Sequence, residues 1–355
     1  MLKKKKTIIA LSLIPQILLV RILSNYPEFV ERFYSHGIYE WLSKLFRFVL
    51  GWLPFSFGDF IYAFTIIYSI RWLLINRRRI KKDTKYWLVD VIATLSIFYF
   101  VFHLLWGMNY HRLPLHKSLK LEYEYDTEQL IAVTEKLIKK SNTLHSTLSE
   151  HDSLAVRFPY SKSDIFKMTP DGYKNLKSVF PHLNYEPASI KKSLFSYPLT
   201  YMGFSGYLNP FTNEAHVDGL IPVYKFPTTS AHEIAHQLGY AAENEANFIG
   251  CLASIKNDDA YFKYTGYTFG LRFCLNEIYR RDEALYETIV ETVNLGILKN
   301  YEEVRRFWEA HQNPTEPLFK LFYGGFLKAN KQSKGMESYS YVVALLVNYF
   351  EKENP

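Results

Sequence analysis

Three long apolar stretches near the start of the chain limit its possible folds more than any other feature of the sequence. They cover about residues 7–23, 57–75 and 86–108, and each approaches the roughly 20 residues that a helix needs to cross a bilayer. We interpret them as three N-terminal transmembrane helices rather than as buried helices of a large soluble core. The lipid bilayer is therefore the expected partner of residues 1–112.

The first stretch follows a lysine cluster, Lys3–Lys6, as the apolar part of a secretory signal peptide would. No small-residue cleavage site comes after it, since Arg21 and Asn25 follow instead. We therefore expect a retained anchor. Residues 45–56 are also largely apolar, but they are too short to span a bilayer and contain Pro54, which suits an interfacial or re-entrant segment.

Basic residues predict how the chain is oriented in the membrane. The net charge is +7, and two clusters, Lys3–Lys6 and Arg77–Lys82, hold more lysines and arginines than this whole excess. Because both clusters adjoin apolar stretches, we interpret them as topology signals that stay in the cytoplasm, and we expect no nucleic-acid partner. Three crossings then place everything after Arg112 outside the cytoplasm.

The rest of the chain, residues 113–355, is charged and contains no further stretch of spanning length, so we expect one extracytoplasmic domain. Helical patterns recur over residues 127–149, from Thr228 onward, and over 283–310 and 340–351. Residues 194–224 place Gly, Pro and Asn between short aromatic runs, which predicts strands and turns. The predicted fold class is α+β, mainly helical, with Cys251 and Cys274 as core residues rather than a disulfide.

The segment that carries chemistry reads HEIAH, from His232 to His236. These two histidines are four residues apart, so on a helix they project from one face and can hold one zinc ion. Glu233 lies between them, where it can act as the general base that takes a proton from water. A helix-capping pair of Ser230 and Glu233 is the simpler alternative, but it leaves His236 unexplained.

A catalytic zinc site usually has three protein ligands. On an unbroken helix Glu243 would lie about 10 Å along the axis from His236, too far to share an ion. The chain must therefore turn near Gly239, a residue suited to a left-handed helix terminus, before a second helix presents Glu243. Small or polar residues share the face of this glutamate: Ala246, Asn247 and Gly250. Glu245 shares its face with apolar residues and is the alternative third ligand.

The run HEIAH, then Gly239, then ENEANF resembles the zincins whose third ligand is a glutamate. These include integral-membrane prenyl-protein and heat-shock-type endopeptidases, whose second helix reads E-x-x-A-D. In this chain the corresponding stretch carries Asn247 in place of the aspartate. The resemblance implies a zincin-like peptidase domain with His232, His236 and Glu243 as zinc ligands.

Over nearly its full length the chain is also similar to an uncharacterised family of bacterial membrane proteins, labelled domain of unknown function 3810. The similar segments are WGMNYHR (106–112), YLNPFTNEAHV (207–217), HEIAHQLGYAAENEANF (232–248) and FLKANKQSKGMESYS (326–340). This resemblance implies a multi-pass protein of the bacterial inner membrane with a zincin-like domain. It implies no substrate.

Several other residues are weaker candidates for the site. His216 could approach it from a strand, although a surface or turn histidine is the simpler interpretation. Tyr264, Tyr267 and Tyr323 could each stabilise an oxyanion. The stretch Tyr207–Val217 is either an edge strand that pairs with an extended peptide or a plain structural hairpin.

The sequence therefore predicts a membrane-anchored zinc metallopeptidase that acts on a peptide or protein substrate, with Glu233 as its base. Two other functions stay open: a zinc-binding but inactive, membrane-tethered interaction domain, and a zinc hydrolase of a non-peptide amide. The presence of Glu233 argues against the inactive domain, because a structural zinc site needs no base. Only substrate profiling separates the two hydrolases.

Overall fold

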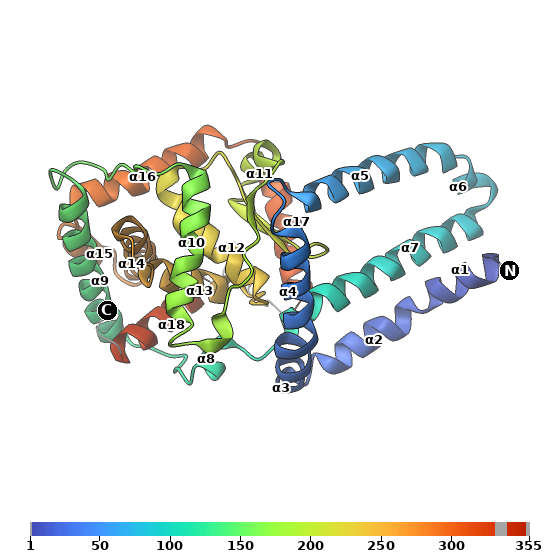
Figure 1. Cartoon of the computed structure of the whole chain (residues 1–355), viewed down its shortest axis with the longest axis horizontal. Helices are drawn as coiled ribbons and strands as arrows, with labels where there is room; N and C mark the ends of the chain where they lie inside the picture. The colour runs from blue at the N-terminus through green and yellow to red at the C-terminus, as the bar shows by residue number, and fades with distance from the viewer. Residues whose placement is uncertain (1, 331–338, 353–355) are drawn as a thin grey trace.

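Three long helices project from one side of a larger helical body in the computed structural model, which describes residues 2–330 and 339–352 (Figure 1). The first is formed by α1 (Leu2–Leu11) and α2 (Leu13–Leu23), which follow each other directly; the others are α5 (Phe57–Asn76) and α7 (Thr84–Leu105). Each is long and apolar enough to cross a membrane, and little of each is buried. The three predicted apolar helices are therefore confirmed as helices.

The far ends of these helices carry both basic clusters. Lys6 Nζ lies 2.7 Å from one carboxylate oxygen of Asp90, and Arg79, in the short helix α6 (Arg79–Lys82), lies 2.9 Å from the other. Nearer the body, Gln16 donates a hydrogen bond of 3.0 Å to Ser96 of α7. Between helices surrounded by lipid the hydrophobic effect is weak, and polar contacts of this kind help to hold such helices together.

Short elements connect the long helices to the body. They are α3 (Pro27–Phe29), the π-helix η1 (Val30–Ile38), α4 (Tyr39–Leu50) and the 3-10 helix η2 (Gly107–His111). Figure 1 shows α4 lying across the ends of the long helices, between them and the body. This segment therefore connects the apolar helices directly to the rest of the fold.

Helices make up most of the body. Their bounds are α8 (Leu115–Ser118), α9 (Thr127–Leu148), α10 (Lys162–Leu176), η3 (Pro181–Leu183), α11 (Ser196–Met202), η4 (Val223–Lys225), α12 (Phe226–Gln237), α13 (Glu243–Ile255), α14 (Ala260–Arg281), α15 (Glu283–Val290), α16 (Leu295–Ala310), α17 (Glu316–Ala329) and α18 (Tyr339–Lys352). The main core is built largely from α9, α13, α14 and α18. Cys251 and Cys274 are buried in it as free thiols, as predicted.

A small sheet of three strands, in the order β1-β3-β2, packs against α12. Its strands are β1 (Ile190–Lys192), β2 (Gly206–Asn209) and β3 (Glu214–Val217), with β3 parallel to β1 and antiparallel to β2. The prediction of strands and turns over residues 194–224 was wrong for α11. Its aromatic residues favour strands, but Gly203, with φ +79°, ends a short helix there.

Candidate metal centre

Helix α12 positions the two histidines. It begins at Phe226, four residues before Ser230, so the capping alternative for Ser230 and Glu233 does not hold. The helix ends at Gln237, and the chain turns as predicted near Gly239, whose φ of +91° places it in the left-handed region. There the Tyr240 amide donates to the Ala235 carbonyl at 3.1 Å and the Gly239 amide to that of His236 at 2.8 Å. These two bonds define a Schellman turn.

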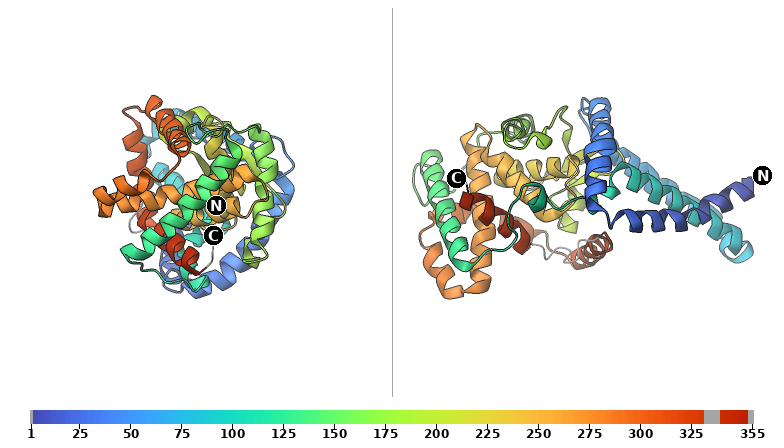
Figure 2. Two further views of the ribbon diagram at one scale, coloured as in Figure 1. Left: turned by 90° about the vertical axis from the view of Figure 1, so that its left-hand side faces the viewer. Right: turned by 90° about the horizontal axis from the view of Figure 1, so that it is seen from below.

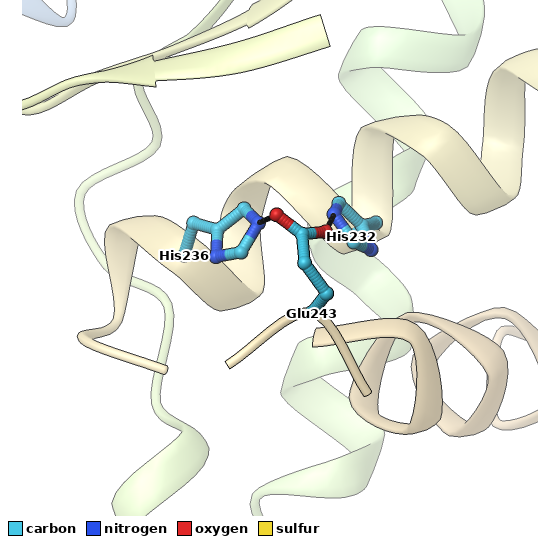
Figure 3. A group of neighbouring side chains, drawn as sticks. All are labelled: His232, His236 and Glu243. Carbon is cyan, nitrogen blue, oxygen red and sulfur yellow. Dashed lines mark ion pairs between the residues drawn. The ribbon is translucent and has the colours of Figure 1, made fainter. Parts of the chain in front are cut away.

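The turn brings α13 back along α12, so that Glu243, the first residue of α13, lies between the two imidazoles (Figure 3). Its carboxylate oxygens lie 3.3 Å from His232 Nε2 and 3.7 Å from His236 Nε2. Zinc bonds of about 2.0–2.2 Å at tetrahedral angles would separate two donors by roughly 3.3–3.6 Å. The three ligand atoms lie within 4.8 Å of one another, so this group could hold a metal ion.

Glu245 does not take part in this group. Its carboxylate is buried and accepts a hydrogen bond of 2.6 Å from the Leu115 amide. Burial raises its pKa to about 7. The structure therefore brings Glu243, and not the alternative Glu245, to the histidines.

Small side chains let the two helices approach closely at the site. A Cβ on Gly250 would lie 2.9 Å from the backbone nitrogen of His232, so only glycine fits there without a shift. Burial lowers the pKa of His232, against the opposing effects of Glu243 and of a side-chain hydrogen bond with Asn247. The face predicted for Glu243 is therefore the face that meets α12.

Two further contacts orient the potential ligands. His236 Nδ1 lies 2.7 Å from the Tyr240 carbonyl, which leaves Nε2 directed toward Glu243. Burial lowers the pKa of His236, but the Glu243 carboxylate outweighs it and raises this pKa to about 9. On the other side Tyr323 of α17 donates a hydrogen bond of 2.5 Å to Glu243. Partners of this kind hold the ligands of metal sites in place.

Glu233 lies beside the group but is not one of its three members. It is buried, and its Oε2 has no hydrogen-bond partner among the described residues. Burial raises its pKa to about 8. A Cβ on Gly206 would lie 2.6 Å from the other carboxylate oxygen, so strand β2 passes directly over this side chain. One oxygen of this buried carboxylate, Oε2, can therefore still accept a hydrogen bond.

Residues from the N-terminal third hold the last carbonyls of α12. Trp106 Nε1 donates to the His236 carbonyl at 3.3 Å, and Tyr39 donates to the Gln237 carbonyl at 2.9 Å. Arg112 donates to the Gly239 carbonyl at 2.9 Å, and its guanidinium lies 3.9 Å from the centre of the Tyr240 ring. These contacts were not predicted from the sequence. The one feature of the sequence that pointed to these residues was the segment WGMNYHR, which is similar to a known family and contains both Trp106 and Arg112.

The weaker candidates fall mostly outside the group. His216 lies on strand β3 and is buried, so its interpretation as a surface or turn histidine was wrong. Its Nε2 lies 2.8 Å from the Ser56 hydroxyl, and it is not a member of the metal group. Tyr264 donates to Asn300 in the core, and Tyr267 also lies in the core. Of the three tyrosines considered, Tyr323 is the one that contacts a potential ligand.

The fold and site define a mainly helical protein with a His-His-Glu group that could hold a metal ion, next to three helices of membrane-spanning length. Its sequence matches the family described as "Protein of unknown function (DUF3810)" over residues 34–347, and the chain belongs to that family. No curated protein and no solved structure gives a significant match.

Proposed function

We propose that this protein is a zinc-dependent peptidase anchored in the membrane by its three long helices. The observation that carries the proposal is the convergence of two imidazoles and Glu243 beside Glu233, a buried carboxylate with an unpartnered oxygen. Two histidines and one glutamate form a donor set that catalytic zinc uses in peptidases. The site is also accessible, since the side chains of His232 and Glu243 are 14% and 25% exposed.

In this mechanism His232, His236 and Glu243 would hold the zinc ion, which would supply Lewis-acid activation of the peptide carbonyl and of water. Glu233 accepts a proton from the attacking water as the water oxygen bonds to the carbonyl carbon. Glu233 then returns this proton to the amine nitrogen as the carbon–nitrogen bond breaks. A base works best with a pKa near the operating pH, and burial brings that of Glu233 to about 8.

The edge strand β2 supports a peptide as the substrate. The backbone amide of Asp218 donates to the Ser205 carbonyl at 2.8 Å, so residues 205 and 218 form a hydrogen-bonded pair of the β2–β3 ladder. Such pairs alternate along an antiparallel ladder with pairs that are not hydrogen-bonded. The backbone groups of Gly206 and Leu208 therefore face the outer edge of β2, with which no other described strand pairs. An extended peptide that adds to this edge would lie beside Glu233.

The arrangement of the basic clusters supports the expected orientation in the membrane. Lys6 of α1 and Arg79 of α6 both reach Asp90. Helices α1 and α6 lie at the end of the long helices that is away from α12 and α13 (Figure 1). Positively charged ends favour the cytoplasm. In this proposal the helical body with its metal group lies outside the cytoplasm, as in a protein of the bacterial inner membrane.

A single substitution tests the peptidase proposal in the full-length protein, loaded with zinc and assayed with fluorescein-labelled β-casein. Glu233→Gln should keep zinc but lose about a hundred- to ten-thousand-fold in rate, because an amide cannot accept the proton. Glu245→Gln is the matched control, since this buried glutamate contacts Leu115 instead, and it should retain the rate. Equal rates in the wild-type protein and Glu233→Gln would refute the mechanism.

A further inference from the structure

Helix α17 combines a face that contacts the metal group with a face that is open and apolar. On the inner face Tyr323 donates to Glu243, and Leu327 is fully buried. The outer side chains are large, apolar and exposed: Leu318, Phe319, Leu321, Phe322 and Phe326. Figure 2 shows that α17 lies near the point where the long helices leave the body.

Helix α4 has the same construction. Its inner face carries Tyr39 and Ser43, which donate to the Gln237 carbonyl of α12, and the buried Arg47. Its outer face carries four exposed apolar side chains: Trp41, Leu45, Phe48 and Val49. An exposed tryptophan, Trp52, follows the helix. Both helices therefore support the metal site with one face and expose an apolar surface with the other.

The position of these two surfaces indicates what covers them. The Phe326 ring lies 6.1 Å from that of Phe102 in α7, so the apolar face of α17 continues that of a membrane-length helix. Likewise α4 is followed by Trp52 and then by α5. Amphipathic helices that lie across the ends of transmembrane helices, with tryptophans at their edges, are typical of the interfacial layer of a bilayer. Monomeric soluble proteins rarely expose large contiguous apolar patches.

We propose that α4 and α17 lie in the interfacial layer of the bilayer, so that the metal group acts on polypeptides anchored in the same membrane. The second part rests on the peptidase function proposed above. Because Tyr323 of α17 contacts Glu243 directly, one helix, about 10–12 Å in diameter, separates the site from the lipid. A segment only a few residues from its own membrane anchor can therefore reach the site.

The position of α17 can be measured without any enzymatic activity. Full-length protein carrying a nitroxide at Leu321→Cys is reconstituted into phosphatidylcholine–phosphatidylglycerol vesicles. Its exposure to oxygen and to a water-soluble nickel chelate is compared with that of Leu295→Cys, an exposed leucine on α16. We expect oxygen exposure at 321 and nickel exposure at 295. Nickel exposure at both positions would refute the proposal, as would spin–spin broadening at 321, which would indicate a second copy of the chain.

The substrate class is tested with one casein segment that the soluble assay shows to be cleaved. The segment is attached to lipid through three residues, which span at most about 10 Å, or through thirty Gly/Ser residues, which average roughly 30 Å. We expect both forms to be cleaved at rates within about threefold. Leu321→Glu should slow the short form at least tenfold relative to the long form, and Leu295→Glu should not.

The outcomes separate the two proposals. Cleavage of the soluble and long-spacer substrates but not of the short one would refute action on polypeptides anchored close to the site and leave the peptidase function standing. Failure of the zinc-loaded wild-type protein to cleave soluble β-casein would refute the peptidase function, while the nitroxide measurement would still report where α17 lies.

Discussion

Gly250 is the position where the packing of α13 against α12 should control metal binding most directly. In Gly250→Ala the added Cβ would lie 2.9, 3.1 and 3.3 Å from the backbone nitrogen, Cα and Cβ of His232. Ordinary carbon contacts are about 3.5–4.0 Å. Because backbone atoms of a buried helix cannot rotate away, α13 has to move by roughly half an ångström.

The two consequences of this movement differ in size. Overpacking of a core costs roughly 1–3 kcal/mol, and replacing a helical glycine by alanine returns roughly 1 kcal/mol, so the net loss of stability should be about 0–2 kcal/mol. Glu243 lies seven residues before Gly250 on the same face of α13, and the movement withdraws its carboxylate from the imidazoles. We expect zinc affinity to fall roughly 10- to 100-fold, as when support for a metal ligand is lost.

Competition with a chromophoric chelator measures zinc affinity in the detergent-solubilised full-length protein, and chemical denaturation measures stability. Gly324→Ala is the matched control, because its added Cβ would meet no described atom within 4 Å apart from its chain neighbours and the nearby backbone of its own helix. It should keep zinc affinity and gain up to about 1 kcal/mol in stability. Unchanged zinc affinity in Gly250→Ala, with both variants folded, would show that the contact with His232 does not set the position of Glu243.

Three other predictions follow from the site and its supports. Zinc-finger sites bind zinc with roughly 10–16 kcal/mol through four ligands, or about 3 kcal/mol per ligand. Glu243→Ala should therefore weaken zinc binding by about 3 kcal/mol, roughly a hundredfold in affinity, whereas Glu245→Ala should keep the metal. The reverse result would make Glu245 the ligand. Tyr323→Phe should weaken zinc binding about 10- to 100-fold in the chelator assay, while a loss of kcat at unchanged affinity would instead indicate oxyanion stabilisation. Burial raises the pKa of Glu31, but His36 and Arg112 outweigh it and lower this pKa to about 2. The ionised Glu31 therefore contributes at most about 3 kcal/mol to the free energy of unfolding. This contribution is complete above pH 4.5 and is lost as the pH falls toward 2. Denaturation at several pH values should show the advantage over Glu31→Gln shrinking in this window, and a constant difference would contradict the ion pair.

Local features of the sequence determined much of this protein. Three apolar stretches predicted three helices because membrane-spanning length is a property of consecutive residues. The spacing of His232 and His236 placed them on one helical face, and the chain was expected to turn at Gly239 because a left-handed residue favours glycine. These predictions depend on contacts within a few residues, for which spacing along the chain is sufficient.

Only the tertiary structure decided how the site is completed. Periodicity ranked Glu243 above Glu245, but both begin the same helix, and their roles follow from what each one meets: the imidazoles in one case and the Leu115 amide in the other. Tyr39 and the carbonyl of Gln237 lie 198 residues apart in sequence. A contact over such a distance leaves no periodic pattern, because it exists only after the chain has folded. The same holds for Tyr323, which was one of 28 tyrosines until folding placed it on Glu243.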